Sequence, residues 1–93
     1  MQPSFDWDQQ SVSPEGRLRV PLIAGYPELE DELRLNLEGR NRDIASEPWG
    51  QMMYLSGGVI VDDVEPDAGD RLRDALDRIL RASHDALRHH EGT

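Results

Sequence analysis

The sequence predicts a small α+β domain with the element order β-α-β-β-α, and two patterns carry this prediction. One is an amphipathic helix pattern over residues 66–90, in which apolar side chains recur at spacings of three and four. The other is an apolar run over 51–63, in which a glycine pair is followed by three β-branched residues. Together they predict a three-stranded antiparallel sheet covered by a short helix and a long C-terminal helix.

The first strand is predicted over residues 17–24 (RLRVPLIA). Leu18, Val20 and Leu22 alternate with other residues there and would share one face of the strand. Pro21 interrupts the run and has no N–H to donate to a neighbouring strand. The segment is therefore predicted to be an edge strand or a bulged strand.

The short helix is predicted over residues 27–38 (PELEDELRLNLE). Pro27 suits a first helical position, acids follow it, and Gly39 lies just past the end. The alternation of leucines with polar residues from Leu33 to Leu37 is also compatible with a strand. The absence of β-branched residues favours the helix.

The hairpin is predicted to turn at Gly57-Gly58, with strands near 51–55 and 59–63. Residues 39–50 contain turn formers and are expected to form the preceding loop. A short helix over 47–55, ended by the glycines, is the alternative interpretation.

The last helix is predicted to start at Asp67 as N-cap. A helix over 67–90 would be about 36 Å long, which is more than a compact domain of this size needs. The excess length predicts that two copies of the chain pair through its apolar stripe. The expected dimer interface comprises Leu72, Leu76, Ile79, Leu80, Ser83 and Leu87.

Composition restricts the classes of partner. The 93-residue chain has a net charge of −9, and all ten of its basic residues are arginine. Binding to nucleic acid or to an anionic membrane needs a basic surface, so neither is expected as a direct partner. A protein partner with a basic or apolar surface is expected instead.

No pattern predicts catalysis, a cofactor or a metal. The chain has no cysteine, no apolar run long enough to cross a membrane and no basic-then-apolar start typical of a signal peptide, so a cytoplasmic location is expected. The acids between 62 and 70 do not have EF-hand spacing. Asp85 and His89 have a helical metal-ligand spacing, but two such ligands do not make a site.

Residues 1–15 are predicted to be a flexible acidic-aromatic tail, followed by a single domain over 16–93. Phe5 and Trp7 lie in this tail between acids. They either fold back onto the domain or form a short docking peptide for a partner.

Two clusters are candidate partner-binding sites. Acids crowd the junction between the hairpin and the last helix, and an apolar, methionine-containing group precedes it. With the aromatic residues of the tail, the predicted partner-binding residues are Asp62, Asp63, Glu65, Trp49, Met52, Met53, Phe5 and Trp7.

The sequence therefore favours a small, acidic, non-enzymatic adaptor or regulatory protein that binds a protein partner. One alternative is a nucleic-acid mimic that inhibits a DNA-binding protein. Another is a small ligand-binding domain with a pocket at a dimer interface. That pocket would lie around Trp49, Tyr54 and either Arg40 or Arg42.

Overall fold

The computed structural model of the chain describes residues 2–40 and 47–91. Five strands, one 3₁₀ turn and two helices follow one another along these residues. They are β1 (Ser4–Phe5), η1 (Trp7–Gln9), β2 (Ser11–Val12), β3 (Leu18–Ile23), α1 (Pro27–Arg40), β4 (Met52–Leu55), β5 (Gly58–Val61) and α2 (Gly69–Glu91). The predicted α+β class is confirmed, and the elements from β3 to α2 follow the predicted order.

The sheet has five antiparallel strands, so the prediction of three strands is wrong in number. Its order is β1-β3-β5-β4, and β2 pairs with the edge of β3 that β1 also uses. The two additional strands come from residues 4–12. Each is two residues long, which is too short to show an alternation in the sequence.

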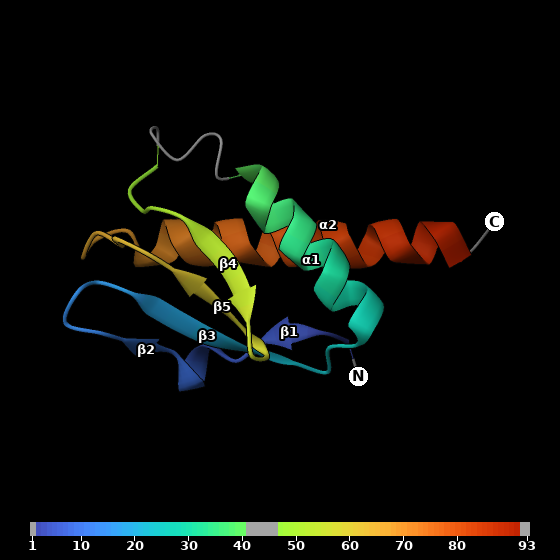
Figure 1. Cartoon of the computed structure of the whole chain (residues 1–93), viewed down its shortest axis with the longest axis horizontal. Coiled ribbons are helices and arrows are strands. Elements are labelled where there is room, and N and C mark those ends of the chain that lie inside the picture. The colour runs from blue at the N-terminus through green and yellow to red at the C-terminus, as the bar shows by residue number, and fades with distance from the viewer. Residues whose placement is uncertain (1, 41–46, 92–93) are drawn as a thin grey trace.

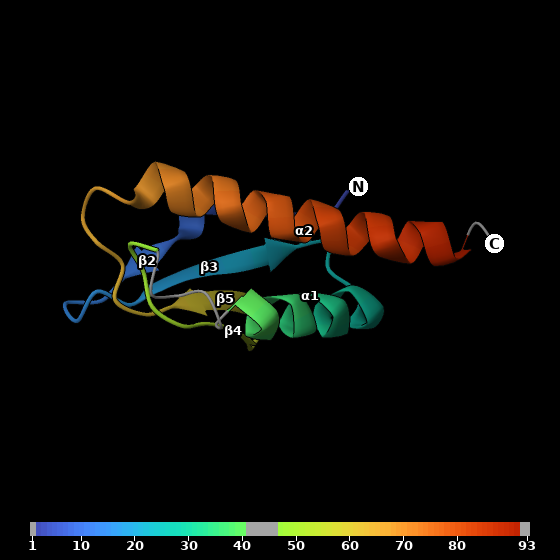
Figure 2. The same cartoon turned by 90° about the horizontal axis from the view of Figure 1, so that it is seen from above.

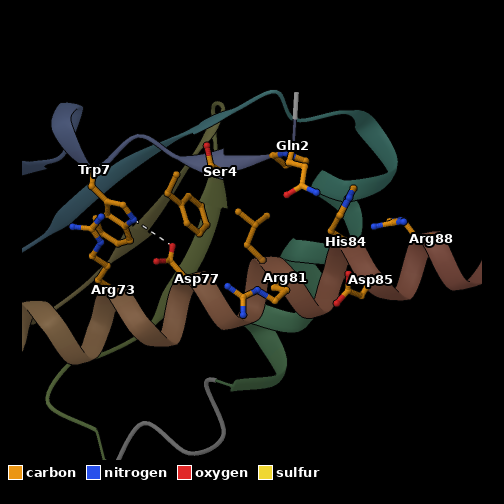
Figure 3. A pocket seen from close by; sticks show the side chains of 12 residues that line it. Gln2, Ser4, Trp7, Arg73, Asp77, Arg81, His84, Asp85 and Arg88 are labelled. Atoms are coloured by element: carbon orange, nitrogen blue, oxygen red, sulfur yellow. Dashed lines mark hydrogen bonds between the residues drawn. The ribbon is translucent and has the colours of Figure 1, made fainter.

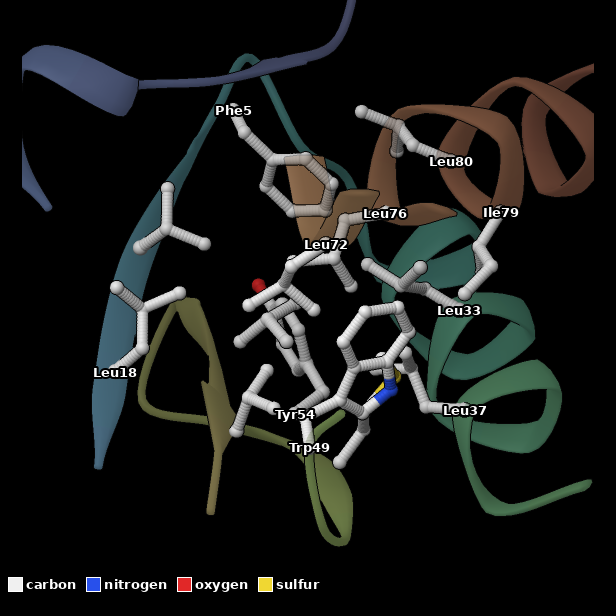
Figure 4. Close-up of a cluster of buried hydrophobic side chains, with 14 of the residues drawn as sticks. Phe5, Leu18, Leu33, Leu37, Trp49, Tyr54, Leu72, Leu76, Ile79 and Leu80 are labelled. Atoms are coloured by element: carbon white, nitrogen blue, oxygen red, sulfur yellow. The ribbon is translucent and has the colours of Figure 1, made fainter. Parts of the chain in front are cut away.

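The helices lie against the sheet and against each other. Helix α2 runs across one face of the sheet, and α1 lies beside β4 and packs on α2 (Figures 1 and 2). Apolar side chains from both helices and from the sheet converge in the space between them (Figure 4). The largest fully buried ones are Leu29, Leu33, Leu37, Leu72, Leu76, Val20, Val59 and Val61.

Pro21 lies in an interior strand, so the prediction of an edge strand is wrong. The Leu22 N–H donates to the Gly57 carbonyl on the β5 side, and the Pro21 carbonyl accepts from Asp6 on the other side. By alternation the Pro21 nitrogen also faces the β1 side. The missing donor therefore falls at the gap between β1 and β2, where it interrupts no ladder.

The β4–β5 hairpin turns one residue earlier than predicted. Ser56 and Gly57 have φ values of 52° and 78°, which are both positive as in the two-residue turns that join twisted strands. Gly58 instead begins β5 and pairs with Leu55. A Cβ atom at Gly58 would lie 2.8 Å from the Val20 carbonyl oxygen, so this close approach requires glycine.

Both helices follow the predicted segments closely. Helix α1 begins at Pro27, and the alternative strand over 27–38 and the alternative helix over 47–55 are not formed. Helix α2 begins at Gly69, two residues after the predicted N-cap Asp67, because residues 65–68 first form a turn.

The segment predicted to be a flexible tail is part of the fold. Phe5 is 6% exposed and belongs to the core. The Trp7 indole N–H donates to Asp77 of α2 at 3.3 Å, and the Arg73 guanidinium lies 5.4 Å from the centroid of the Trp7 ring. The 3₁₀ turn η1 therefore fastens the N-terminal segment to α2.

Replacement of Phe5 by alanine tests this role. We expect Phe5→Ala to lower the free energy of unfolding by about 3–5 kcal/mol, because it removes a buried ring and leaves a cavity. The matched control is Gln9→Ala at an exposed position, which should change stability by less than about 0.5 kcal/mol. Equal unfolding midpoints in urea for the two variants would show that the segment is a tail.

Tyr54 is buried, and the pKa of its phenol is raised above the ordinary tyrosine value. It is 6% exposed, and its hydroxyl makes no hydrogen bond within residues 2–40 and 47–91. Burial raises the pKa of the phenol, and the charge of Glu30 raises it further, while Arg34 acts in the opposite direction. The folded state therefore holds the phenolic proton more tightly than the unfolded state does.

This pKa difference predicts a loss of stability at high pH. Below the ordinary value of 10.0 both states are protonated. Above it the unfolded chain ionises first, so stability falls as pH rises. Tyr54→Phe should abolish this part of the loss and leave stability at neutral pH equal or up to about 1 kcal/mol higher. Urea unfolding of Tyr54→Phe and of Tyr26→Phe, each at neutral pH and above the ordinary tyrosine pKa of 10.0, provides the check. The same pH dependence of stability in both variants would contradict the prediction.

Candidate functional site

One face of the sheet is not covered by either helix (Figure 2). Side chains in β4 alternate between buried and exposed, so Met53 and Leu55 point away from the core. The strand register places Met53 beside Ile60 and Leu55 beside Gly58. We define the open sheet face as Pro21, Ile23, Met53, Leu55 and Ile60.

This open sheet face is strongly apolar for the surface of an acidic chain. Leu55 is 54% exposed, Met53 is 38% exposed and Ile23 is 36% exposed, while Pro21 and Ile60 are half-buried. Contiguous apolar groups on a protein surface are typical of interaction sites.

The charged groups on the same side of the sheet are already engaged. Arg19 lies opposite Ile60 in the register of β3 and β5, and its guanidinium donates to the Ser56 carbonyl at 2.8 Å. Arg17 forms an ion pair with Asp62 at 2.7 Å, where β3 begins and β5 ends. The central part of the open sheet face therefore presents no unpaired charge from these side chains.

An acidic depression adjoins that end of the open sheet face. Its volume is ≈ 570 Å³, and its lining is Ser13, Glu15, Arg17, Asp62 and Asp63. A hydrogen bond with the Ser13 side chain lowers the pKa of Glu15, so this carboxylate is charged at neutral pH. With one of its acids paired to Arg17, the depression keeps a net negative charge.

The structure separates the predicted partner-binding residues. Phe5, Trp49 and Met52 are buried in the core, and Trp7 is half-buried against α2. Met53 lies on the open sheet face. Phe5, Trp49 and Met52 are therefore not on the surface of the folded chain, because the small core needs their apolar area.

The predicted acidic junction is also divided. Asp62 and Asp63 line the acidic depression. Glu65 lines a different cavity of ≈ 310 Å³, which Trp7 and Val12 also line. The junction therefore does not act as one acidic patch, since its acids face two different hollows.

The residues of the predicted dimer interface lie in the core of a single chain. Leu72, Leu76, Ile79 and Leu80 are at most 5% exposed. Leu87 is partly buried against the same cluster. This stripe is occupied by the sheet and by α1, so it is not available as an interface between folded copies.

Ser83 shows how closely the two helices meet. It is fully buried, and its hydroxyl donates to the Ile79 carbonyl and accepts a hydrogen bond from the Asn36 amide, both at 2.7 Å. A polar residue predicted to face another copy instead joins α2 to α1.

A groove runs between β1 and α2 (Figure 3). Its volume is ≈ 480 Å³, and the N-terminal strand forms one wall while α2 forms the other. Arginines on α2 line it together with His84, whose Nδ1 lies 3.2 Å from the Tyr26 hydroxyl. Phe5 and Leu80 supply its apolar part.

The metal site and the pocket that the sequence analysis considered fall only in part on the described residues. Within residues 2–40 and 47–91, no group of three or more His, Asp or Glu side chains could hold a metal ion. In the alternative pocket, Trp49 and Tyr54 are buried in the core. The Arg40 side chain and Arg42 lie outside the described residues, as does the side chain of His89. Of the helices described, none has the long apolar sequence needed to cross a membrane.

Comparisons with protein-family models, with curated proteins and with solved structures find no significant match to this chain. Function is therefore inferred from the geometry and chemistry of the chain's own residues.

Sequence reasoning missed most of the open sheet face and the groove. Alternation within 52–55 and 58–61 does contain the signal for Leu55 and Ile60, since side chains two apart share a face. Glu15 and Arg17 gave no signal, because they join Asp62 only through the pairing of β3 with β5.

A charge placed in the α2 stripe distinguishes a core from a dimer interface. We expect Leu76→Asp to unfold the chain, since an unpaired buried carboxylate costs several kcal/mol. Ala82→Asp, at an exposed position of the same helix, should remain folded. Circular dichroism and light scattering provide the measurement, and a folded, monomeric Leu76→Asp variant would restore the dimer interpretation.

Proposed function

We propose that the chain is a small, non-enzymatic adaptor that binds a protein partner through its open sheet face. The observation that supports this proposal is the exposure of Met53 and Leu55 on a sheet face that no described helix covers. A chain with a core this small gains nothing from leaving such area in water. Its retention is understandable if a partner covers it.

The chemistry around the open sheet face favours a partner with an apolar patch and adjacent basic residues. The apolar patch would pack on Met53, Leu55 and Ile60. A basic side chain of the partner would enter the acidic depression beside Glu15 and Asp63. The net charge of −9 would accelerate association with a basic partner and would be screened by salt.

A second copy of the chain is a poor occupant of the same face. Two copies would bring together two charges of −9, and the depression offers acids to acids. Like charges across an interface suppress association. A different, basic protein is therefore the favoured partner.

The experiment compares two leucines that are both exposed. Leu55 lies on the open sheet face, whereas Leu35 is 63% exposed on α1. Wild type, Leu55→Asp and Leu35→Asp are immobilised, exposed to an extract of the source cells, and the retained proteins are identified by mass spectrometry. A protein retained by wild type is then purified and titrated against all three chains.

We expect Leu55→Asp to weaken binding of that partner at least about tenfold, as loss of a central apolar contact does. Leu35→Asp should bind as wild type does, and affinity should fall as salt is added. Both variants should unfold at the wild-type temperature, because both side chains are exposed. Equal binding by Leu55→Asp and wild type would exclude the open sheet face as the docking surface.

A further inference from the structure

The groove between β1 and α2 is lined by more arginines than acids, although the chain as a whole is acidic. Arg81 and Arg88 line it and are exposed. Neither forms an ion pair or hydrogen bond with another described side chain. Arg73, at the other end, is stacked on Trp7. Two uncommitted guanidinium groups in a chain of net charge −9 indicate a site for carboxylates.

The free edge of β1 forms the opposite wall of this groove. Ser4 pairs with Ile23, and Asp6 donates to the Pro21 carbonyl, so these positions are bonded to β3. Alternation in an antiparallel ladder then directs the N–H and C=O of Phe5 away from β3. Among the described residues no strand pairs with β1 on that side. An added strand could use these groups.

The shape of the groove favours an extended chain over a compact small molecule. Its lining on α2 runs from Arg73 to Arg88, which is about 22 Å at 1.5 Å per residue. About seven residues of extended peptide cover the same distance. Figure 3 shows the wall formed by Gln2 and Ser4 running alongside α2 over much of this length.

We propose that this groove binds an extended acidic peptide segment of a protein partner. The segment adds to the free edge of β1 as a further strand. Its carboxylates accept hydrogen bonds from Arg81 and Arg88, and Asp85, which also lines the groove, requires that they lie on either side of it. His84, held by Tyr26, contacts the segment from the same wall.

Nucleic acid is a poorer occupant of the groove. Asp77 and Asp85 line it beside the arginines, and a phosphate backbone needs a continuous basic surface. A peptide can place its carboxylates at the two arginines and keep uncharged residues elsewhere. Because the groove is separate from the open sheet face, this proposal goes beyond the function proposed above.

The test uses a fluorescein-labelled peptide of alternating glutamate and valine, with the full chain as titrant and anisotropy as the readout. Arg81→Gln and Arg88→Gln should each weaken binding about tenfold, since each removes a charge-assisted hydrogen bond. Arg78→Gln is the matched control, an exposed arginine of the same helix outside the groove. It should bind within about twofold of wild type, and so should Leu55→Asp.

Three further probes identify the occupant. The same peptide with alternate amides N-methylated should lose binding, because strand addition needs those donors. A lysine–valine peptide should not bind, and free succinate at about millimolar concentration should not compete. The proposal is overturned if the glutamate–valine peptide fails to bind. It is equally overturned if Arg78→Gln loses as much affinity as Arg81→Gln, if methylation has no effect, or if succinate displaces the peptide.

Discussion

Burial of the apolar stripe of α2 is the interaction on which the rest of the structure depends. Leu72 is 1% exposed and Leu76 is 0% exposed. Helix α1, the sheet and the N-terminal segment all pack around α2. A chain of 93 residues has little apolar area to distribute. The other elements therefore pack on one long helix, and the buried side chains of Phe5 and Trp49 contribute to the same core.

This economy explains why one sheet face remains uncovered. Both helices pack on the core side, so neither helix of the described chain covers Met53 and Leu55. The same arrangement leaves the outer flank of α2 facing β1, with Arg81 and Arg88 along it. The open sheet face and the groove between β1 and α2 thus both result from the packing of the two helices on one side of the sheet. They lie on different sides of the fold.

Local sequence patterns predicted the elements whose signal is long. The leucine spacing of 27–38 and the stripe of 66–90 gave both helices, and the residues around Gly57 gave the hairpin. The patterns failed where pairing is non-local or short. Nothing in residues 4–12 shows that Phe5 enters the core, because β1 and β2 are defined by their bonds to β3. The stripe of α2 was assigned to a second copy because periodicity shows which face is apolar, not what covers it.

The hydrogen bond from Trp7 to Asp77 spans 70 positions of the chain, and it has a consequence for how the protein folds during synthesis. Trp7 cannot make this contact until α2 has been synthesised. Until then, the face of the β4–β5 hairpin that packs on α2 in the folded chain is exposed to solvent. Contacts of such high separation slow folding, since a long loop must close before they form. The nascent chain consequently remains vulnerable to aggregation until its final third has been translated.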